Sequence, residues 1–315
     1  MVTEPMLITE YIIHGPTDLT IAIVADLHEH DPAAVLSILK EVSPDVIAVP
    51  GDLFENHEFG ENLDKADESL ISRLLCSIIH YTNKLAGLRW KQRHDVKKEH
   101  AYEFLMKASE IAPVLYSRGN HELYLTEEDK AVFQNAGVHV LNNSSVVIKN
   151  VLFGGIPSKQ TSGKIDIDFL RSFGEAVAVP KDVDEMDESL NTVDKDELVD
   201  EPMESGEPIY KVLLCHHPEY YRFLQSYNID LILSGHAHGG QIRVANYGIF
   251  SPGQGLLPKL TKGVYDGRLV VSAGCSNTAS IPRWGNPCEV VVVRVENSSS
   301  ERSVNSERAV GKVER

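Results

Sequence analysis

The stretch Thr20-Ile21-Ala22-Ile23-Val24-Ala25-Asp26-Leu27-His28 joins an apolar, β-branched run to two side chains that can bind a metal ion. A short run of this composition is typical of a buried strand, and the polar side chains follow directly after it. Four further apolar runs also end beside a possible metal ligand, at residues 45–50, 112–116, 211–215 and 230–233. We expect the ends of these five strands to converge on one rim of the protein.

The residues after the other four runs are also of the types that hold metal ions. They are Gly51-Asp52, Gly119-Asn120-His121-Glu122, His216-His217 and Gly235-His236-Ala237-His238. A two-metal centre needs a bridging carboxylate and further ligands around ions that lie roughly 3.5–4 Å apart. A mixture of imidazole, carboxylate and amide ligands suits Mn, Fe, Zn, Co or Ni better than Mg or Ca. The pattern therefore predicts two divalent transition-metal ions.

Composition narrows the class of protein. The chain has 315 residues, of which 42% are hydrophobic, and it has no apolar stretch near the roughly 18 residues of a membrane helix. The N-terminus also lacks the pattern of a signal peptide, so we expect a cytoplasmic protein without a transmembrane segment. The formal net charge of -16 argues against binding to nucleic acid, whose phosphates attract basic surfaces. The oligomeric state is not predicted by these features.

The acidic charge is concentrated in one segment. Residues 175–207 contain thirteen Asp and Glu against two Lys, and they show no regular apolar period. We expect a loop insertion at about residues 175–208 within a single domain that covers residues 1–296. The remaining residues, 297–315, are polar and rich in Ser, which predicts a disordered tail.

Strand and helix signals alternate along the domain, as in layered α/β proteins. Amphipathic patterns predict helices at residues 33–42, 70–85 and 101–111. Apolar runs predict two neighbouring strands at residues 138–141 and 145–154, joined by Asn142-Asn143, and two more strands at residues 269–273 and 290–295. We expect a four-layer α/β/β/α sandwich, in which two mixed sheets are flanked by helices and the dimetal site lies at the C-terminal ends of strands.

Some of the candidate ligands have a simpler explanation when taken alone. Asp26 and Asp52 could cap helices that follow their strands, since Asp is favoured at such positions. Either His216 or His217 could be a ligand while the other serves a structural role. The five motifs taken together favour metal binding over these alternatives.

The five motifs occur in the order D-x-H, G-D, G-N-H-[DE], H and G-H-x-H, from Asp26 to His238. In this order and composition the chain resembles the calcineurin-like metallophosphoesterases, the superfamily with the purple acid phosphatase-like fold. Residues 235–241 and Pro287-Cys288-Glu289-Val290 resemble its bacterial phosphoesterase branch, which includes membrane-anchored phosphoesterases and lipid-precursor pyrophosphatases.

The resemblance implies a role for each matching residue. One metal would be held by Asp26, His28 and His238, the other by Asn120, His216 and His236, and Asp52 would bridge them. The family spacing before Pro218 selects His216 rather than His217 as the ligand. A bridging hydroxide would be the nucleophile. His121 would stabilise the phosphoryl oxygens and protonate the leaving group, and Glu122 would orient His121 or an adjacent backbone group.

Two functions are compatible with these motifs. The first is hydrolysis of a small phosphodiester or phosphomonoester; the second is a non-catalytic metal-binding scaffold of the same fold. The complete set of ligands favours the enzyme. Arg118, just before Gly119, is a candidate contact for the substrate phosphate. The choice of substrate depends on the loops around the site, so the motifs do not predict it.

Overall fold

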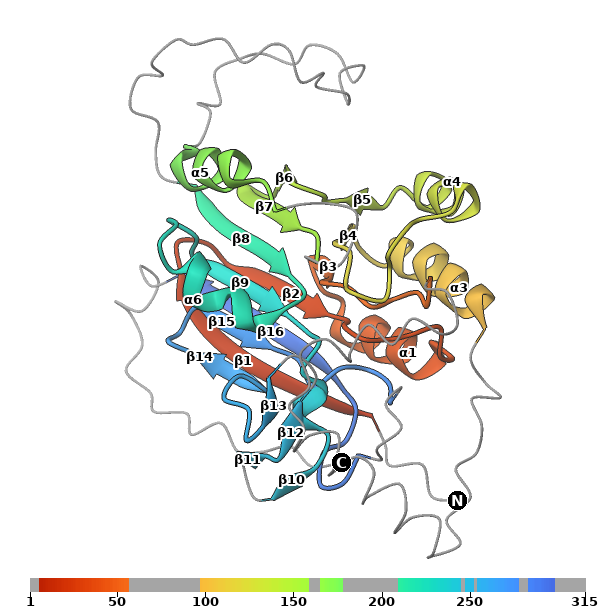
Figure 1. The fold of residues 1–315 in the computed structure, drawn as a ribbon. Coiled ribbons are helices and arrows are strands. Elements are labelled where there is room, and N and C mark those ends of the chain that lie inside the picture. Colours follow the sequence, from red (N-terminus) through yellow and green to blue (C-terminus); the bar gives the residue numbers. More distant parts are fainter. Residues whose placement is uncertain are drawn as a thin grey trace, which may run out of the picture.

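The computed structural model describes residues 6–56, 97–158, 165–177, 209–244, 247–251, 254–277 and 283–297. Within these ranges the chain forms two six-stranded sheets that pack face to face (Figure 1). The predicted helix at residues 70–85, the acidic segment from residue 178 to 208 and the tail from residue 298 lie outside the described residues.

The first sheet carries three of the predicted ligand motifs. Its strands lie in the order β1 (Leu7–Gly15), β16 (Glu289–Asn297), β2 (Leu19–Ile23), β3 (Val46–Val49), β4 (Val114–Tyr116) and β5 (His139–Val140). Strands β2 to β5 run parallel, and β16 is antiparallel to β2. Strands β2, β3 and β4 are short, apolar and almost entirely buried, which suits strands that are covered on both faces.

The second sheet carries the other two motifs. Its order is β14 (Gly263–Tyr265), β15 (Leu269–Val271), β9 (Leu231–Ser234), β8 (Tyr210–Cys215), β7 (Val151–Ile156) and β6 (Ser144–Ile148). The four central strands are parallel, whereas β14 and β6 are antiparallel to their neighbours. Both sheets are therefore mixed, as the sequence predicts.

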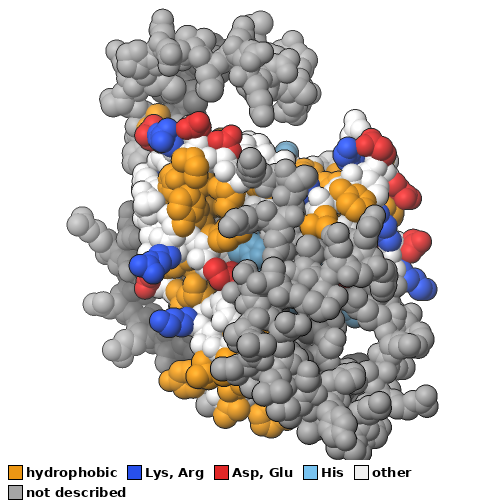
Figure 2. Space-filling model, in the orientation of Figure 1, with side chains coloured by type: hydrophobic (Ala, Val, Ile, Leu, Met, Phe, Trp, Pro, Cys, Tyr) orange, Lys and Arg blue, Asp and Glu red, His pale blue; other side chains and the backbone are white. Residues whose placement is uncertain are grey.

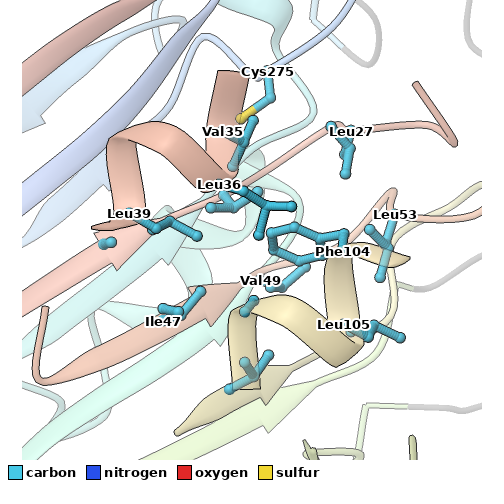
Figure 3. Close-up of a cluster of buried hydrophobic side chains, with 14 of the residues drawn as sticks. Leu27, Val35, Leu36, Leu39, Ile47, Val49, Leu53, Phe104, Leu105 and Cys275 are labelled. Atoms are coloured by element: carbon cyan, nitrogen blue, oxygen red, sulfur yellow. The ribbon is translucent and has the colours of Figure 1, made fainter. Parts of the chain in front are cut away.

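Helices cover the outer face of each sheet, which gives the four layers. The first sheet is covered by α1 (Ala33–Val42), α3 (Lys98–Ser109) and α4 (Glu127–Ala136). Figure 3 shows Leu36 and Leu39 of α1 and Phe104 of α3 packed over Ile47 and Val49 of β3. The second sheet is covered by α5 (Ile167–Glu175) and α6 (Tyr221–Leu224). A third apolar cluster fills the space between the sheets, so the predicted sandwich is confirmed.

The helix boundaries follow from local chemistry. Helix α1 begins after Pro32, and the Asp31 side chain accepts a hydrogen bond from the Ala33 N–H. Helix α4 begins with a reciprocal capping box between Thr126 and Asp129. The same helix ends at Gly137, whose φ of 66° is easily adopted by glycine.

One prediction about the second sheet is wrong. Residues 145–154 were expected to form one strand beside residues 138–141, with Asn142-Asn143 between them. Instead the run folds back at Lys149-Asn150, where both residues have positive φ, and β6 and β7 form an antiparallel hairpin. Residues 139–140 belong to β5 in the first sheet, so Asn142-Asn143 joins one sheet to the other.

Short hairpins follow the last motif. They consist of β10 (Arg243–Val244) with β11 (Tyr247–Gly248), and of β12 (Phe250–Ser251) with β13 (Gly255–Leu256). Val244, Tyr247 and Leu256 on these strands are exposed, as are Leu257 and Trp284. Figure 2 shows hydrophobic side chains gathered in the lower region where Figure 1 places these hairpins. Among the described residues, none of the helices could span a membrane.

Candidate metal centre

All predicted ligands follow the carboxyl ends of parallel strands. Asp26 and His28 follow β2, Asp52 follows β3, and Asn120 follows β4 in the first sheet. From the second sheet, β8 and β9 deliver the remaining ligands, which are His216, His236 and His238. The two sheets meet here directly, because the backbone N–H of His236 donates to Asp26 Oδ1 over 3.1 Å.

Five of these ligands have a left-handed backbone. Their φ angles are 55° for Asp26, 50° for His28, 55° for Asp52, 66° for His236 and 44° for His238. Non-glycine residues rarely adopt this region, although Asp and His do so more readily than most. Such strained conformations persist where the surrounding structure requires them, often at functional sites. Here these conformations occur in the segments that follow β2, β3 and β9.

The first group of ligand atoms comprises Asp26, His28 and His238. His238 Nε2 lies 4.0 Å from Asp26 Oδ1, and the rings of His28 and His238 are stacked with centroids 5.5 Å apart. Two atoms bound to one ion at roughly 2.1 Å can be up to about 4.2 Å apart, so this group fits a single ion. His28 Nε2 is buried and has no hydrogen-bond partner within the described structure, which is compatible with a role as a metal ligand.

The second group comprises Asp52, His216 and His236, with Asn120 beside them. His216 Nε2 lies 3.1 Å from Asp52 Oδ2 and 3.0 Å from Asn120 Oδ1. His236 Nε2 is buried without a hydrogen-bond partner among the described residues. This arrangement of nitrogen and oxygen donors also fits one transition-metal ion.

Asp52 lies between the two groups. Its Oδ2 is 3.1 Å from His216 Nε2 of the second group and 3.7 Å from His28 Nε2 of the first. Its Oδ1 accepts a hydrogen bond of 3.0 Å from the backbone N–H of His121. Gly119 makes this approach possible, since a Cβ at that position would lie 2.1 Å from Asp52 Oδ1. The residues present therefore fit two ions that share one carboxylate.

The protonation states of the histidines differ. Burial lowers the pKa of His236 and His238 well below the usual value, so both are neutral and can donate an electron pair to a metal. Burial also opposes the charged form of His216, but the nearby carboxylates of Asp52 and Asp26 outweigh it and raise its pKa to about 9. In the metal-free protein at neutral pH, a proton therefore occupies His216.

His121 lies at the opening of this site. Its side chain is 24% exposed, whereas those of His28 and His216 are fully buried. The His121 ring contacts His28 edge to face, with centroids 4.7 Å apart, and its Nε2 lies 3.9 Å from Asp52 Oδ2. His121 therefore lies beside two candidate ligands and also has access to solvent.

Sequence reasoning missed Glu55, which holds two of these histidines. Glu55 Oε1 lies 2.8 Å from His28 Nδ1, and Oε2 lies 3.1 Å from His121 Nδ1. An acceptor at each Nδ1 keeps a proton on that nitrogen and orients each ring so that its Nε2 faces Asp52. The hydrogen bonds of the two histidines keep the pKa of Glu55 far below its usual value despite burial. Its position three residues after Asp52 was the available signal.

Glu122 is fully buried and fixes two ligand loops to each other. Its Oε2 accepts hydrogen bonds from the backbone N–H groups of Asp52 and Gly119, and its Oε1 accepts from those of Leu53 and Phe54. Burial and the charge of Asp52 raise its pKa to about 7. Of the two expected roles, the structure favours the orientation of backbone groups.

Arg118 and His217 lie at the margin of the site. Arg118 is largely buried, and its backbone carbonyl accepts a hydrogen bond from the Ser158 N–H. His217 Nε2 lies 2.6 Å from Ser158 Oγ, while its ring contacts that of His236 with centroids 4.1 Å apart. Among the described groups, His216 rather than His217 approaches Asp52 and Asn120.

Comparison with known proteins gives one family match and distant relatives. A family model described as calcineurin-like phosphoesterase matches residues 19–240. An uncharacterized metallophosphoesterase of Aquifex aeolicus (strain VF5) is 29% identical over 187 residues, which cover 58% of this chain and 60% of the relative. The uncharacterized protein YpbG of Bacillus subtilis (strain 168) is 28% identical over 145 residues, or 45% of each protein. The chain thus spans about half the length of these curated relatives.

A solved structure is similar at a lower level. The crystal structure of a cold-active protein-tyrosine phosphatase from a psychrophilic Shewanella species is 14% identical to this chain. The alignment covers 91% of this chain and 77% of that one with a TM-score of 0.31, which is too low to support a structural argument.

Proposed function

Because the chain belongs to the calcineurin-like phosphoesterase family, we propose that it is a dinuclear metal-dependent hydrolase that cleaves a phosphodiester or a phosphomonoester. The proposal goes beyond family membership in three respects, which are the number of metal ions, the residues that hold them and the reaction. A small phosphoester is the proposed substrate.

The proposed ligands form two sets with a shared carboxylate. One ion would be held by Asp26, His28 and His238, the other by Asn120, His216 and His236, and Asp52 would serve both. The single observation that carries this assignment is the position of Asp52 Oδ2, which lies 3.1 Å from His216 Nε2 and 3.7 Å from His28 Nε2. The unpartnered Nε2 atoms of His28 and His236 support it.

When bound, two such ions supply an activated water and neutralise charge on the phosphoryl group. The mixed nitrogen and oxygen donors suit Mn, Fe, Zn, Co or Ni. Within the chain, the strand ends hold the ligands apart at fixed positions, so that little reorganisation is needed during the reaction.

His121 is the proposed acid. Its Nδ1 is held by Glu55 at 3.1 Å, which leaves Nε2 directed at the site. With both ring nitrogens protonated, the imidazolium donates a hydrogen bond from Nε2 to a phosphoryl oxygen and gives that Nε2 proton to the leaving oxygen, while Nδ1–H stays bonded to Glu55. Glu55 acts as a positioning residue for both His121 and His28. The exposed apolar side chains on β10 and β13, shortly after His238, are candidate contacts for the rest of the substrate.

Activity assays with a panel of phosphoesters test this function. Purified protein is expected to hydrolyse a nitrophenyl phosphodiester or monoester after loading with at least one of the five metals, and to lose this activity in a chelator. Removing a residue that only hydrogen-bonds a metal ligand typically lowers activity by roughly 10–100-fold. Because Asp52 is itself a proposed ligand, Asp52→Asn should lower activity by more than this. Asp168→Asn, at an exposed position on α5, is the matched control. Protein that binds two ions but hydrolyses no ester would favour the non-catalytic scaffold.

A further inference from the structure

Glu219 lies in the short 3-10 helix Pro218–Tyr220, directly after β8, and its carboxylate turns toward the second group of ligands. Its Oε1 is 3.9 Å from His236 Nε2, and its Oε2 is 3.7 Å from His217 Nδ1. Neither distance is short enough for a hydrogen bond. Three side chains that can each donate an electron pair therefore face one another.

Contact with solvent does not supply hydrogen-bond partners for the Glu219 carboxylate. The Glu219 side chain is 25% exposed, but both of its oxygens are shielded, and neither has a hydrogen-bond partner within the described structure. Leaving a buried carboxylate without a donor is unfavourable, so such a group calls for a missing partner. The partner must also satisfy His236 Nε2, which is unpartnered too.

A metal ion satisfies both atoms at once. Two ligands bound to one ion at roughly 2.1 Å can be as much as about 4.2 Å apart, and 3.9 Å lies within that limit. His217 borders the same space and is held by Ser158 through its Nε2, so its Nδ1 keeps facing Glu219. The ligand atoms of His217, Glu219 and His236 all lie within 4.8 Å of one another.

We propose that Glu219 is a ligand of the metal ion held at His236. The inference rests on the proposed dinuclear centre and adds to it a carboxylate that the second ion does not share with the first. With Asn120, Asp52 and Glu219 around it, the second ion has more oxygen ligands than the first. Such a shell favours Mn or Fe over Zn, which prefers four ligands rich in nitrogen or sulfur.

Metal titration of the full-length protein tests this proposal without relying on catalysis. Mn²⁺ is added to metal-free wild type, Glu219→Gln and Glu219→Asp, and free and bound Mn²⁺ are measured by electron paramagnetic resonance. In Glu219→Gln, one ion should bind as in wild type and the other at least tenfold more weakly. Glu219→Asp should restore part of the affinity. Glu103→Gln, at an exposed position on α3, should match wild type for both ions.

Thermal melting separates a metal ligand from a structural residue. Without metal, Glu219→Gln should melt at the wild-type temperature or above it, because an unpartnered carboxylate is removed. With Mn²⁺ the variant should gain less stability than wild type. A variant that melts lower in both conditions, or binds both ions within twofold of wild type, would overturn the proposal. If wild type binds one ion only, the dinuclear centre is wrong, and the same comparison on that ion decides the role of Glu219.

Discussion

His121 differs from the buried histidines of the site because part of its side chain reaches solvent. An acid at this position matters most when the leaving oxygen is strongly basic. His121→Asn is therefore expected to lower kcat by about 10²–10⁴-fold for an alkyl phosphoester, and by much less for a nitrophenyl ester. The ratio of kcat between the two substrates, measured for variant and wild type, checks this expectation.

The leaving-group comparison has an internal control. Metal content of His121→Asn should stay at the wild-type value, because the proposed ligands are unchanged. An equal loss of kcat with both esters would remove the acid role and leave His121 with stabilisation of the phosphoryl oxygens alone.

The raised pKa of His216 predicts that the affinity for metal depends on pH. Since Asp52 and Asp26 raise its pKa to about 9, a proton must leave before the imidazole can bind an ion. His236 and His238 are already neutral and release none. We expect metal affinity to rise about tenfold per pH unit up to pH 9 and then to level off. Calorimetry in buffers of different ionisation enthalpy counts the protons that are released when metal binds. If metal binding at pH 7 releases no proton, the account is contradicted.

Most site residues could be proposed from sequence because each follows an apolar run, and the fold brings Asp52, His216 and His236 within reach of each other. Glu55 and Glu219 could not be recognised in the same way. Each lies three residues after a motif residue, Asp52 or His216, where a carboxylate is equally compatible with an exposed turn. Only the turns of the backbone direct them at histidines.

At the scale of elements, Glu122 joins the loops after β3 and β4 through four backbone hydrogen bonds. Glu122→Gln keeps the shape but replaces one acceptor oxygen by an NH₂ group that faces N–H donors. We expect the free energy of unfolding to fall by about 2–3 kcal/mol, in line with the cost of unsatisfied buried donors. Denaturant titration of the metal-free variant and wild type measures this difference in the free energy of unfolding.

The matched surface variant is Glu127→Gln on α4, where the side chain is exposed and little change is expected. If Glu122→Gln unfolds at the same denaturant concentration as wild type, the four bonds do not hold the loops together. The metal site would then need another source of rigidity.

The wrong prediction for residues 145–154 also belongs to this scale. Residues 145–154 are mostly apolar and predict one long strand, and Lys149-Asn150 in the middle lacks the Asn-Gly or Asp-Gly pair that most clearly marks a tight hairpin. Asn142-Asn143 has a stronger turn signal, but it connects two sheets rather than two neighbouring strands. Local sequence predicts that the chain turns, whereas the partner of each strand is set by packing between distant segments.

At the scale of the whole molecule, the order of strands explains why one site forms. β2, β3 and β4 are neighbours in the first sheet, and β8 and β9 are neighbours in the second, so all five motifs emerge at the same edge. The layered class could be predicted because apolar strands and amphipathic helices alternate. The strand order could not, since β16, from the end of the domain, inserts beside β2.

We propose that residues 1–296 act as one domain and that the acidic segment is dispensable for chemistry. None of the described ligand groups includes a residue of α5 or of the start of β8. Replacing residues 178–208 by a flexible Gly-Ser linker should leave metal content unchanged and kcat within about twofold of wild type, the range of a surface change. A variant with native circular dichroism but without metal would show that the segment supports the centre.

The central claim is that two ions share Asp52 at the joint edge of the two sheets. Anomalous diffraction from crystals grown with Mn²⁺ tests it most directly. We predict two peaks roughly 3.5–4 Å apart on either side of the Asp52 carboxylate, one beside His28 and one beside His236. A single peak, or peaks away from Asp52, would contradict the account.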